Sequence, residues 1–303
     1  MKKLFYKLVV LFFLLFIPML IIVLLPSSHN NYLFAIIDKH QRLSNTESPR
    51  IVLAGGSNLA FGIDSKMMQE TLNISVINTG IHVGIGLGRT LDDIMPYLST
   101  GDILVIAPEY QCFTDAWNGS VPAYELIFDM HNYPLAKHSS FYKMPFGNSF
   151  IIYAKNKILA LIPRSSNPIS YSRDGFNEYG DYIKHLELEN QPFESLSVSG
   201  KINASYLSAF YRIVDSFKKQ GIQVFITYPS YEEISFQYSI DMINELDMAL
   251  QEERAMTVIS SPEDYCFPTN YFYDTAYHLN SKGREIRTAR LVQDITRYIG
   301  IAN

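Results

Sequence analysis

The chain has 303 residues, of which 48% are hydrophobic and 18% charged. This composition excludes a disordered protein, and the length excludes a mini-protein held together by disulfides. No acidic residue precedes Asp38, whereas Lys2, Lys3 and Lys7 come before an unbroken apolar run over residues 8–25. Such a run excludes a purely soluble protein.

The N-terminal apolar run, extended by residues 4–6, approaches the roughly 20 residues needed to cross a bilayer. Leu24-Leu25-Pro26-Ser27-Ser28 follows it instead of a small-residue cleavage site, so we expect an uncleaved signal anchor over residues 1–27. Lysines before the run, and none shortly after it, predict a cytoplasmic N-terminus. Residues 28–49 are expected to be a linker, and everything beyond the anchor is expected to be exported.

The charge of the exported part limits the partners that it can bind, and its cysteine content limits the disulfides that it can form. Three of the 25 Lys and Arg residues precede the apolar run, which leaves 22 against 30 Asp and Glu, a net charge of −8. Such a surface is not suited to nucleic acid or anionic lipid. Cys112 and Cys266 are the only cysteines. In an oxidising compartment they can form one disulfide, and the alternative is two unpaired small hydrophobic residues.

No cofactor or metal site is expected from the sequence. The segment Gly55-Gly56-Ser57-Asn58 has neither the Walker spacing with its lysine nor the G-x-G-x-x-G pattern. The acidic pairs Asp92-Asp93 and Glu232-Glu233 have no His or Cys grouped with them. We therefore interpret these pairs as solvated helix charges and not as metal ligands.

From Arg50 onward, short apolar runs alternate with amphipathic stretches, the pattern of an α/β fold with a mostly parallel sheet. In chain order, we predict strands at 51–54, 74–77, 103–107, 222–227 and 256–259 and helices after Asp64 and over 87–98, 207–219, 243–250 and 281–299. These elements make a three-layer α/β/α doubly wound parallel sheet of about five strands, within a domain over residues 50–303. Its ligands would sit beyond the carboxyl ends of the strands.

The alternation breaks down over residues 111–200, which we predict to be an insertion over the active edge of the sheet. Two stretches of it, near 122–130 and 149–161, are expected to be helical. Tyr171, Tyr179 and Tyr182 crowd its second half. Both core packing and sugar stacking use tyrosine, and core packing is the favoured interpretation.

Ser57 directly follows the first predicted strand, in Leu53-Ala54-Gly55-Gly56-Ser57-Asn58. Two glycines allow a sharp turn, and the serine would then project from the carboxyl end of the strand with a helix beyond it. A serine in that place can attack a substrate. The alternative is a glycine turn with a capping serine.

A serine nucleophile needs a base, and His278 is the histidine that stands out. It lies between the fifth predicted strand and the last helix, where Asn280 is a plausible N-cap that would hold its loop at the carboxyl edge of the sheet. Asp274, four residues earlier, could accept the imidazole N–H and fix the tautomer. For an isolated Asp-x-x-x-His the alternative is a surface loop.

Together, the two segments resemble the SGNH, or GDSL-like, hydrolase superfamily, in which a serine after strand one and a last Asp-x-x-His block supply a catalytic triad. Gly80, in Asn78-Thr79-Gly80 after the second strand, matches the second-block glycine, whose N–H helps to form the oxyanion hole. The resemblance implies Ser57, His278 and Asp274 as catalytic residues. It implies the N–H groups of Ser57 and Gly80 as the oxyanion hole.

The chain departs from the SGNH pattern at three points. Gly56 stands in place of the first-block Asp, Pro108-Glu109-Tyr110 replaces the third-block Gly-x-Asn-Asp, and the Asp-to-His spacing is one residue longer. Asp264 and Glu109 are therefore alternatives to Asp274 as the orienting acid. Asn58, Glu109 and Tyr110 are candidate substrate-binding residues.

The layout also resembles membrane-anchored bacterial SGNH-like proteins of alginate acetylation and teichoic-acid D-alanylation, which have one N-terminal span and a degenerate third block. The resemblance implies a single-pass protein of the bacterial cytoplasmic membrane whose C-terminal domain faces the periplasm or exterior. It implies acyl transfer to or from a hydroxyl of a cell-surface glycan or acylated polymer, with a multi-span membrane acyltransferase as a possible partner. The alternative is a non-catalytic polysaccharide-binding or assembly protein on a degenerate SGNH fold.

Overall fold

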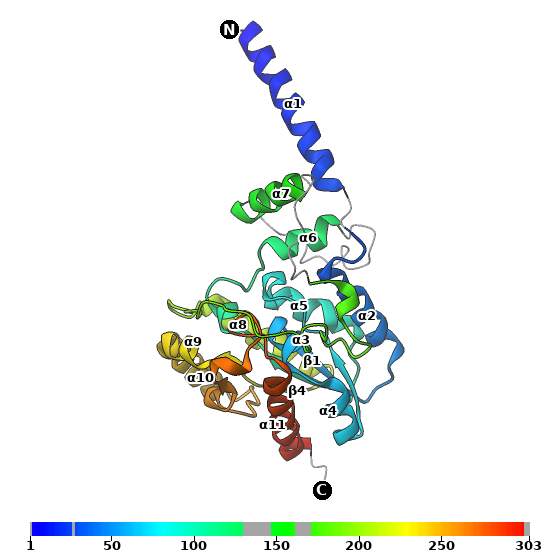
Figure 1. The fold of residues 1–303 in the computed structure, drawn as a ribbon, viewed down its shortest axis with the longest axis vertical. Helices are drawn as coiled ribbons and strands as arrows, with labels where there is room; N and C mark the ends of the chain where they lie inside the picture. Colours follow the sequence, from blue (N-terminus) through cyan, green and yellow to red (C-terminus); the bar gives the residue numbers. More distant parts are fainter. Residues whose placement is uncertain (1, 26–27, 130–146, 161–170, 300–303) are drawn as a thin grey trace.

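Four short parallel strands form the centre of the molecule (Figure 1). The computed structural model describes residues 2–25, 28–129, 147–160 and 171–299. The strands are β1 (Arg50–Gly55), β2 (Ser75–Asn78), β3 (Ile103–Ala107) and β4 (Gln223–Ile226), in the spatial order β2-β1-β3-β4. β1 and β3 are buried along their whole length, which agrees with their apolar sequences because parallel strands are covered on both faces.

A fifth strand is not formed at residues 256–259, contrary to our prediction. Val258 alone makes a parallel bridge to Ile226, whose N–H donates to the Thr257 carbonyl oxygen at 2.9 Å. The chain then leaves the sheet because Pro262 begins the 3₁₀ helix η8 (Pro262–Tyr265). The parallel sheet therefore has four strands, and a separate pair joins β5 (Tyr231–Glu232) to β6 (Cys266–Phe267).

Helices pack against both faces of the sheet. Successive strand residues point to opposite faces, so Ile51 and Leu53 belong to one hydrophobic cluster and Val52 and Ala54 to another. The first cluster includes α4 (Ser65–Leu72) and α11 (Ser281–Ile299), and the second includes α5 (Leu87–Ile94), α8 (Ala204–Lys219) and α10 (Ile240–Glu252). The chain is thus a mixed α/β protein built on a parallel sheet.

The ends of several helices follow signals in the sequence. Asp64 accepts a hydrogen bond from the third residue of α4 at 3.0 Å, and Asn280 accepts one from the third residue of α11 at 3.1 Å. Gly221, with a φ of +80°, follows the end of α8. The helix predicted over 87–98 is shorter because Pro96 lacks the N–H needed to continue it, and η3 (Met95–Tyr97) follows α5.

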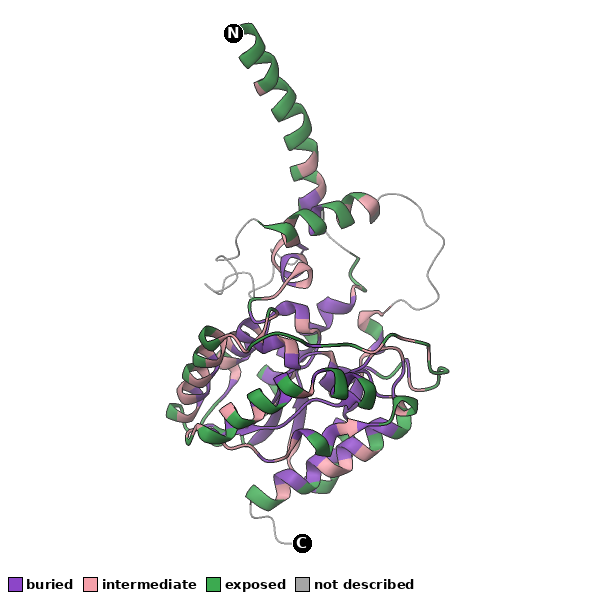
Figure 2. Cartoon of the chain, turned by 90° about the vertical axis from the view of Figure 1, so that its left-hand side faces the viewer, coloured by how far each residue is buried: buried purple, intermediate pink, exposed green. Residues whose placement is uncertain are grey.

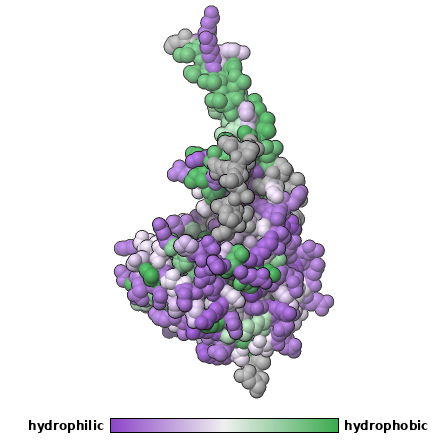
Figure 3. Space-filling model, in the orientation of Figure 1, coloured by the Kyte–Doolittle hydropathy of each residue, from purple (hydrophilic) through white to green (hydrophobic). Residues whose placement is uncertain are grey.

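One helix of the described chain is long and apolar enough to cross a membrane. α1 (Lys2–Leu24) contains an 18-residue window with a mean hydropathy of 3.0. Nearly all of its side chains are exposed, and it projects away from the domain as an apolar rod (Figures 2 and 3). This agrees with a single-pass anchor. The orientation of the span stays a prediction.

Residues 28–49, predicted to be a linker, are instead part of the folded domain. They form η1 (Tyr32–Phe34) and α2 (Ala35–Asn45). The Tyr32 hydroxyl donates to the Ile81 carbonyl at 2.7 Å, and the buried Lys39 ammonium donates to the Asn78 carbonyl at 2.9 Å. The segment is bound to the carboxyl end of β2 by these contacts.

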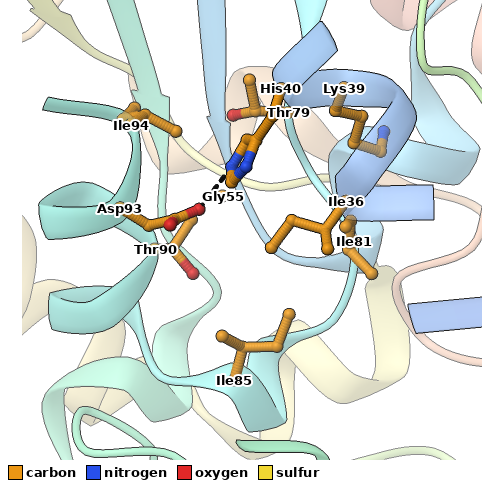
Figure 4. A pocket seen from close by; sticks show the side chains of 10 residues that line it. All are labelled: Ile36, Lys39, His40, Gly55, Thr79, Ile81, Ile85, Thr90, Asp93 and Ile94. Atoms are coloured by element: carbon orange, nitrogen blue, oxygen red, sulfur yellow. Dashed lines mark hydrogen bonds and ion pairs between the residues drawn. The ribbon is translucent and has the colours of Figure 1, made fainter. Parts of the chain in front are cut away.

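α2 also contributes His40 to a buried hydrogen bond with Asp93 (Figure 4). His40 Nε2 lies 2.6 Å from Asp93 Oδ2. The cavity beside them measures about 10 Å³, room for no more than one water molecule, so the pair is structural and not a binding site. The interpretation of Asp93 and Glu232 as solvated charges is wrong: both are buried, and Glu232 caps α9 (Glu233–Tyr238).

The described part of the insertion at 111–200 contains two α-helices and a return segment. α6 (Val121–Asp129) and α7 (Asn148–Ala160) agree with the predicted helical stretches, whose last residues, Met130 and Leu161, lie outside the described residues. Residues 171–185 then pass the end of β2, where Asn78 N donates to the Tyr179 carbonyl at 2.9 Å. This part of the insertion does lie over the edge where we predicted the site.

Both cysteines are free thiols, so the candidate disulfide is not formed. Cys112 lies in η4 (Tyr110–Phe113), directly after β3, and Cys266 lies in β6. Each packs in the larger of the two clusters on the sheet. Burial raises the pKa of the Cys112 thiol well above its ordinary value. The structure agrees with the alternative interpretation, in which the two cysteines are unpaired small hydrophobic residues.

Candidate active site

Ser57 begins a short helix directly beyond the first strand. β1 ends at Gly55, Gly56 makes the turn, and Ser57 is the first residue of α3 (Ser57–Gly62). The half-buried Ser57 hydroxyl donates to Glu109 Oε1 at 3.2 Å, and Asn58 N donates to the same oxygen at 3.0 Å. The glutamate thus caps the N-terminus of α3 and holds the predicted nucleophile.

Glu109 fills the space that a side chain at position 56 would need. A Cβ atom added to Gly56 would lie 2.3 Å from Glu109 Oε1, and Glu109 is only 1% exposed. Two departures from the SGNH pattern are therefore coupled in space, because the glycine in the first block makes room for the glutamate after β3. Nothing in the sequence connects the two positions.

Burial raises the pKa of Glu109, and several interactions oppose the rise. They are the hydrogen bond from the Asn58 N–H, the charge of His278 and hydrogen bonds from neighbouring side chains. The second carboxyl oxygen, Oε2, accepts from Gln111 Nε2 at 3.1 Å. Glu109 is thus held at both oxygens and lies close enough to His278 to interact with its charge.

Asn58 and Tyr110, two of the candidate substrate-binding residues, are fully buried. Arg287 of α11 donates through Nη2 to Asn58 Oδ1 at 2.8 Å. Tyr110 N donates to the Tyr277 hydroxyl at 3.3 Å, and the Tyr110 ring packs edge-on against Tyr231, with centroids 5.2 Å apart. Both side chains support the site from within the core, so the structure does not place them against a substrate.

His278 and Asp274 form a hydrogen-bonded pair in the loop before α11. His278 Nδ1 lies 2.8 Å from Asp274 Oδ1. The four-residue spacing is accommodated by a turn in which Thr275 Oγ1 accepts from the N–H groups of Tyr277 and His278, both at 3.2 Å. Burial acts to raise the pKa of Asp274, but the hydrogen bond and charge of His278 and the hydrogen bond from Tyr171 outweigh it and lower that pKa.

Tyr171 and Phe61 fix the position of the imidazole. The Tyr171 hydroxyl donates to Asp274 Oδ2 and lies 3.4 Å from His278 Nδ1. The Phe61 ring stacks on the imidazole, with centroids 3.9 Å apart and an interplanar angle of 6°. Among the described residues, both polar contacts of the imidazole use Nδ1. Nε2 is therefore left for a nucleophile or a substrate.

Phe61 also relates His278 to Ser57. Ser57 and Phe61 are four residues apart in α3, a spacing that puts both side chains on one face of a helix. Because Phe61 stacks on the imidazole, the serine and the histidine lie beside the same helix face. The Ser57 hydroxyl donates to Glu109 in this structure, and no hydrogen bond joins these two described side chains directly.

Of the three carboxylates considered as the orienting acid, Asp274 is the one paired with His278. Asp264 accepts hydrogen bonds from the N–H and the hydroxyl of Ser261, at 2.9 and 3.0 Å, and so caps η8. Glu109 contacts the serine and not the imidazole. The longer Asp-to-His spacing does not require another acid.

Gly80 lies against the first block, but its N–H is engaged. A Cβ atom at Gly80 would lie 2.7 Å from the Gly56 carbonyl oxygen, so this close approach requires glycine. The Gly80 N–H donates to Asn78 Oδ1 at 3.0 Å. The second of the two predicted oxyanion-hole donors is therefore occupied. The first, the N–H of Ser57, belongs to the opening turn of α3, where amides have no partner within the helix.

Two further histidines border the site, and sequence reasoning missed both. The pKa of His82 and that of His185 are each lowered to about 4, mainly by burial, and the charge of His278 acts in the same direction. His185 Nε2 lies 2.9 Å from the Leu279 carbonyl oxygen. Because a carbonyl only accepts, Nε2 carries the proton, and Nδ1 is buried without a partner in the described part of the chain.

The residues that were missed differ in whether any signal could have found them. Phe61 follows Ser57 by one turn of α3, a helix that we did not predict because the predicted helix begins only after Asp64. Tyr171 and His185 come from the insertion, where no periodicity relates them to the site. Among the tyrosines of the insertion, Tyr182 is a core residue, 3% exposed, whereas Tyr171 reaches the predicted catalytic pair.

No protein-family model matches the chain, and no curated protein matches it. Within the described residues, no group of three or more His, Cys, Asp or Glu side chains could hold a metal ion.

Proposed function

We propose that this chain is a membrane-anchored serine esterase or O-acyltransferase that acts on a cell-envelope or exported polysaccharide. The observation that carries the proposal is the Asp274–His278 pair, at 2.8 Å, whose imidazole stacks on Phe61 one helical turn from Ser57. A carboxylate, an imidazole and a serine hydroxyl are the parts of a nucleophilic triad. The strand order and the helices on both faces support the three-layer SGNH-type fold.

In the proposed reaction, Ser57 Oγ attacks an ester carbonyl carbon while His278 Nε2 takes its proton. Asp274 keeps the other imidazole proton on Nδ1 and stabilises the imidazolium. The ester C–O bond breaks, His278 gives its proton to the leaving alcohol, and the acyl group remains on Ser57. Water or a sugar hydroxyl then attacks the acyl-enzyme with His278 as the base, which frees the serine.

Glu109 holds the Ser57 hydroxyl by a hydrogen bond before the reaction begins. The serine hydroxyl must rotate from Glu109 towards His278 before it can attack, since it donates to the carboxyl group at rest. Burial favours the neutral form of Glu109 by raising its pKa. The neutral form suits the reaction, because a carboxylate beside the serine would repel the negative charge that develops on the substrate oxygen.

A fluorophosphonate probe on the full-length protein tests the chemistry. We expect covalent labelling of wild type, loss of labelling in Ser57→Ala and in His278→Ala, and normal labelling in Ser205→Ala, which removes an exposed hydroxyl on α8. Absence of labelling in wild type, or equal labelling in Ser57→Ala, would contradict the proposal. Mass spectrometry of the labelled peptide identifies the modified serine.

The second candidate function is a non-catalytic polysaccharide-binding or assembly protein. It is favoured by the engaged state of the site, where the Ser57 hydroxyl is bound to Glu109 and the Gly80 N–H to Asn78. Complementation separates the two. If Ser57→Ala and His278→Ala both restored a deletion strain fully while removal of the insertion did not, the non-catalytic function would be the better account.

A further inference from the structure

The insertion is bound to the end of the membrane-spanning helix. The Tyr153 hydroxyl of α7 donates to the Val23 carbonyl of α1 at 3.1 Å. The Lys157 ammonium of α7 donates to the Leu25 carbonyl. The last carbonyls of a helix have no partner within it and carry partial negative charge, so a hydroxyl and a cation are suitable groups to bind them. α7 thus caps α1 at its exit from the membrane.

An aromatic cluster keeps α7 in that position. Tyr124 and Phe128 of α6 pack with Phe150 and Tyr153 of α7, and the buried Val23 of α1 belongs to the same cluster. α7 lies at the foot of α1, with α6 between it and the sheet domain (Figure 1). Lys157 also pairs with Asp129 at the end of α6, at 2.6 Å. The two helices of the insertion and the end of the span therefore form one packed unit.

The opposite face of α7 is exposed and carries three isoleucines among polar side chains. Ile151, Ile152 and Ile158 are 65%, 47% and 41% exposed, although isoleucine is usually buried. They lie on the side of α7 that faces away from Tyr153 and Ala154, and these two residues are buried against α6 and α1. The exposed Lys155 shares this outer face. Figure 2 shows most of α7 as exposed, directly beside the end of the span.

We propose that the outer face of α7 lies in the interface of the bilayer leaflet that α1 leaves, as a second, in-plane membrane contact. A helix fixed to the last carbonyls of a span lies at the depth where hydrocarbon gives way to headgroups. Helices that lie in this region bury an apolar face, and a lysine beside that face extends its ammonium towards the phosphates. The proposal rests on α1 spanning the membrane and is independent of the esterase chemistry.

Tryptophan quenching by brominated lipid tests this contact. The full-length chain carrying Ile152→Trp is reconstituted in vesicles of phosphatidylcholine brominated in the acyl chains. The native Trp117 is 7% exposed and supplies the background. Met248→Trp is the matched control, because Met248 is a 58% exposed hydrophobic residue on α10, away from α1. We expect the emission added by Ile152→Trp to be quenched at least about twofold, as for an interfacial helix, and that added by Met248→Trp to be unchanged.

Equal quenching of the two variants would overturn the proposal. An unquenched Ile152→Trp would contradict the proposal in the same way, because lipid is the only binding partner that the vesicles offer. If Ile152→Trp does not fold, Ile152→Cys and Met248→Cys carrying a polarity-sensitive fluorophore give the same comparison. A blue shift confined to position 152 would support the membrane contact, and equal emission maxima would reject it. The fluorophosphonate experiment tests the esterase chemistry separately, and its result does not depend on whether α7 contacts lipid.

Discussion

The candidate site has a histidine side and a serine side, and the two differ in the partners that their side chains bind. On the histidine side, Asp274 and Phe61 hold the imidazole with Nδ1 engaged. On the serine side, the Ser57 hydroxyl is bound to Glu109. In the proposed mechanism the histidine half keeps its present partners, whereas the serine half has to give up its hydrogen bond to Glu109. For the proposed triad, the difference teaches that release of Ser57 from Glu109 is the step that has to precede attack.

The largest expected effect is on the histidine side. Asp274→Asn should preserve the fold and reduce kcat about 10⁴-fold, because an amide that donates to Nδ1 favours the wrong imidazole tautomer. Glu109→Gln should stay within about tenfold of wild type, since the amide oxygen can still accept from Asn58 N. Asp264→Asn, which alters only the cap of η8, is the control. The reverse order among the three would move the triad to another carboxylate.

A substitution on the serine side tests the coupling of Gly56 to Glu109. Gly56→Ala should destabilise the protein by about 1–3 kcal/mol because the new methyl group would overlap Glu109 Oε1. The backbone at Gly56, with φ −93°, is open to alanine, so strain is not the cause. Denaturant unfolding of Gly56→Ala, Glu109→Ala and the double variant measures the effect. Additive losses would show that the two positions are independent.

His185 makes the histidine side sensitive to acid. Its folded-state pKa of about 4 lies below the ordinary 6.5, so the folded state binds fewer protons between these values. The free energy of unfolding should therefore fall as the pH drops from 6.5 to 4, by about 3 kcal/mol from this residue. His185→Phe, in its aromatic surroundings, should remove that part of the pH dependence. An unchanged pH profile of unfolding would contradict the assignment.

A smaller effect than that of Asp274→Asn is expected from Tyr171→Phe. It removes the hydroxyl that donates to Asp274, so the pKa of that carboxyl should rise towards its ordinary value. We expect a loss of about tenfold in kcat with KM unchanged, the size of one hydrogen bond to a charged group. Tyr179→Phe is the matched control, because its ring packs on Arg42 away from the catalytic pair. Equal losses in the two variants would mean a general effect of the insertion.

Four strands of the sheet and the long helices around it could be predicted closely, whereas the end of the sheet and the segment before β1 could not. The runs at 51–54 and 103–107 are apolar throughout, and the structure places β1 and β3 there. The run at 256–259 is apolar except for Thr257 and has only a bridge, because turns at both ends limit it. Residues 28–49 carry polar side chains that suggested a linker, yet Lys39 and His40 are buried because each has a partner from the domain.

For the candidate site, spacing within one element is informative and contact between distant elements is not. The pairing of Asp274 with His278 could be predicted from their spacing in one loop, whereas the contact of Phe61 with His278 could not, because the short helix α3 was not predicted. The contact of Glu109 with Gly56 and that of Tyr171 with Asp274 join residues 53 and 103 positions apart. Such contacts depend on tertiary packing, which hydrophobic periodicity does not encode.

The position of α2 decides where the chain could be cut without loss of the domain's packing. A cut between the end of α1 and Tyr32 would keep every contact of α2, and α7 would still hold the end of α1. A cut beyond α2 that freed this segment would remove His40 and leave Asp93 Oδ2 buried without it, a change that typically costs about 1–3 kcal/mol. Proteolysis would therefore spare the packing of the domain only ahead of Tyr32.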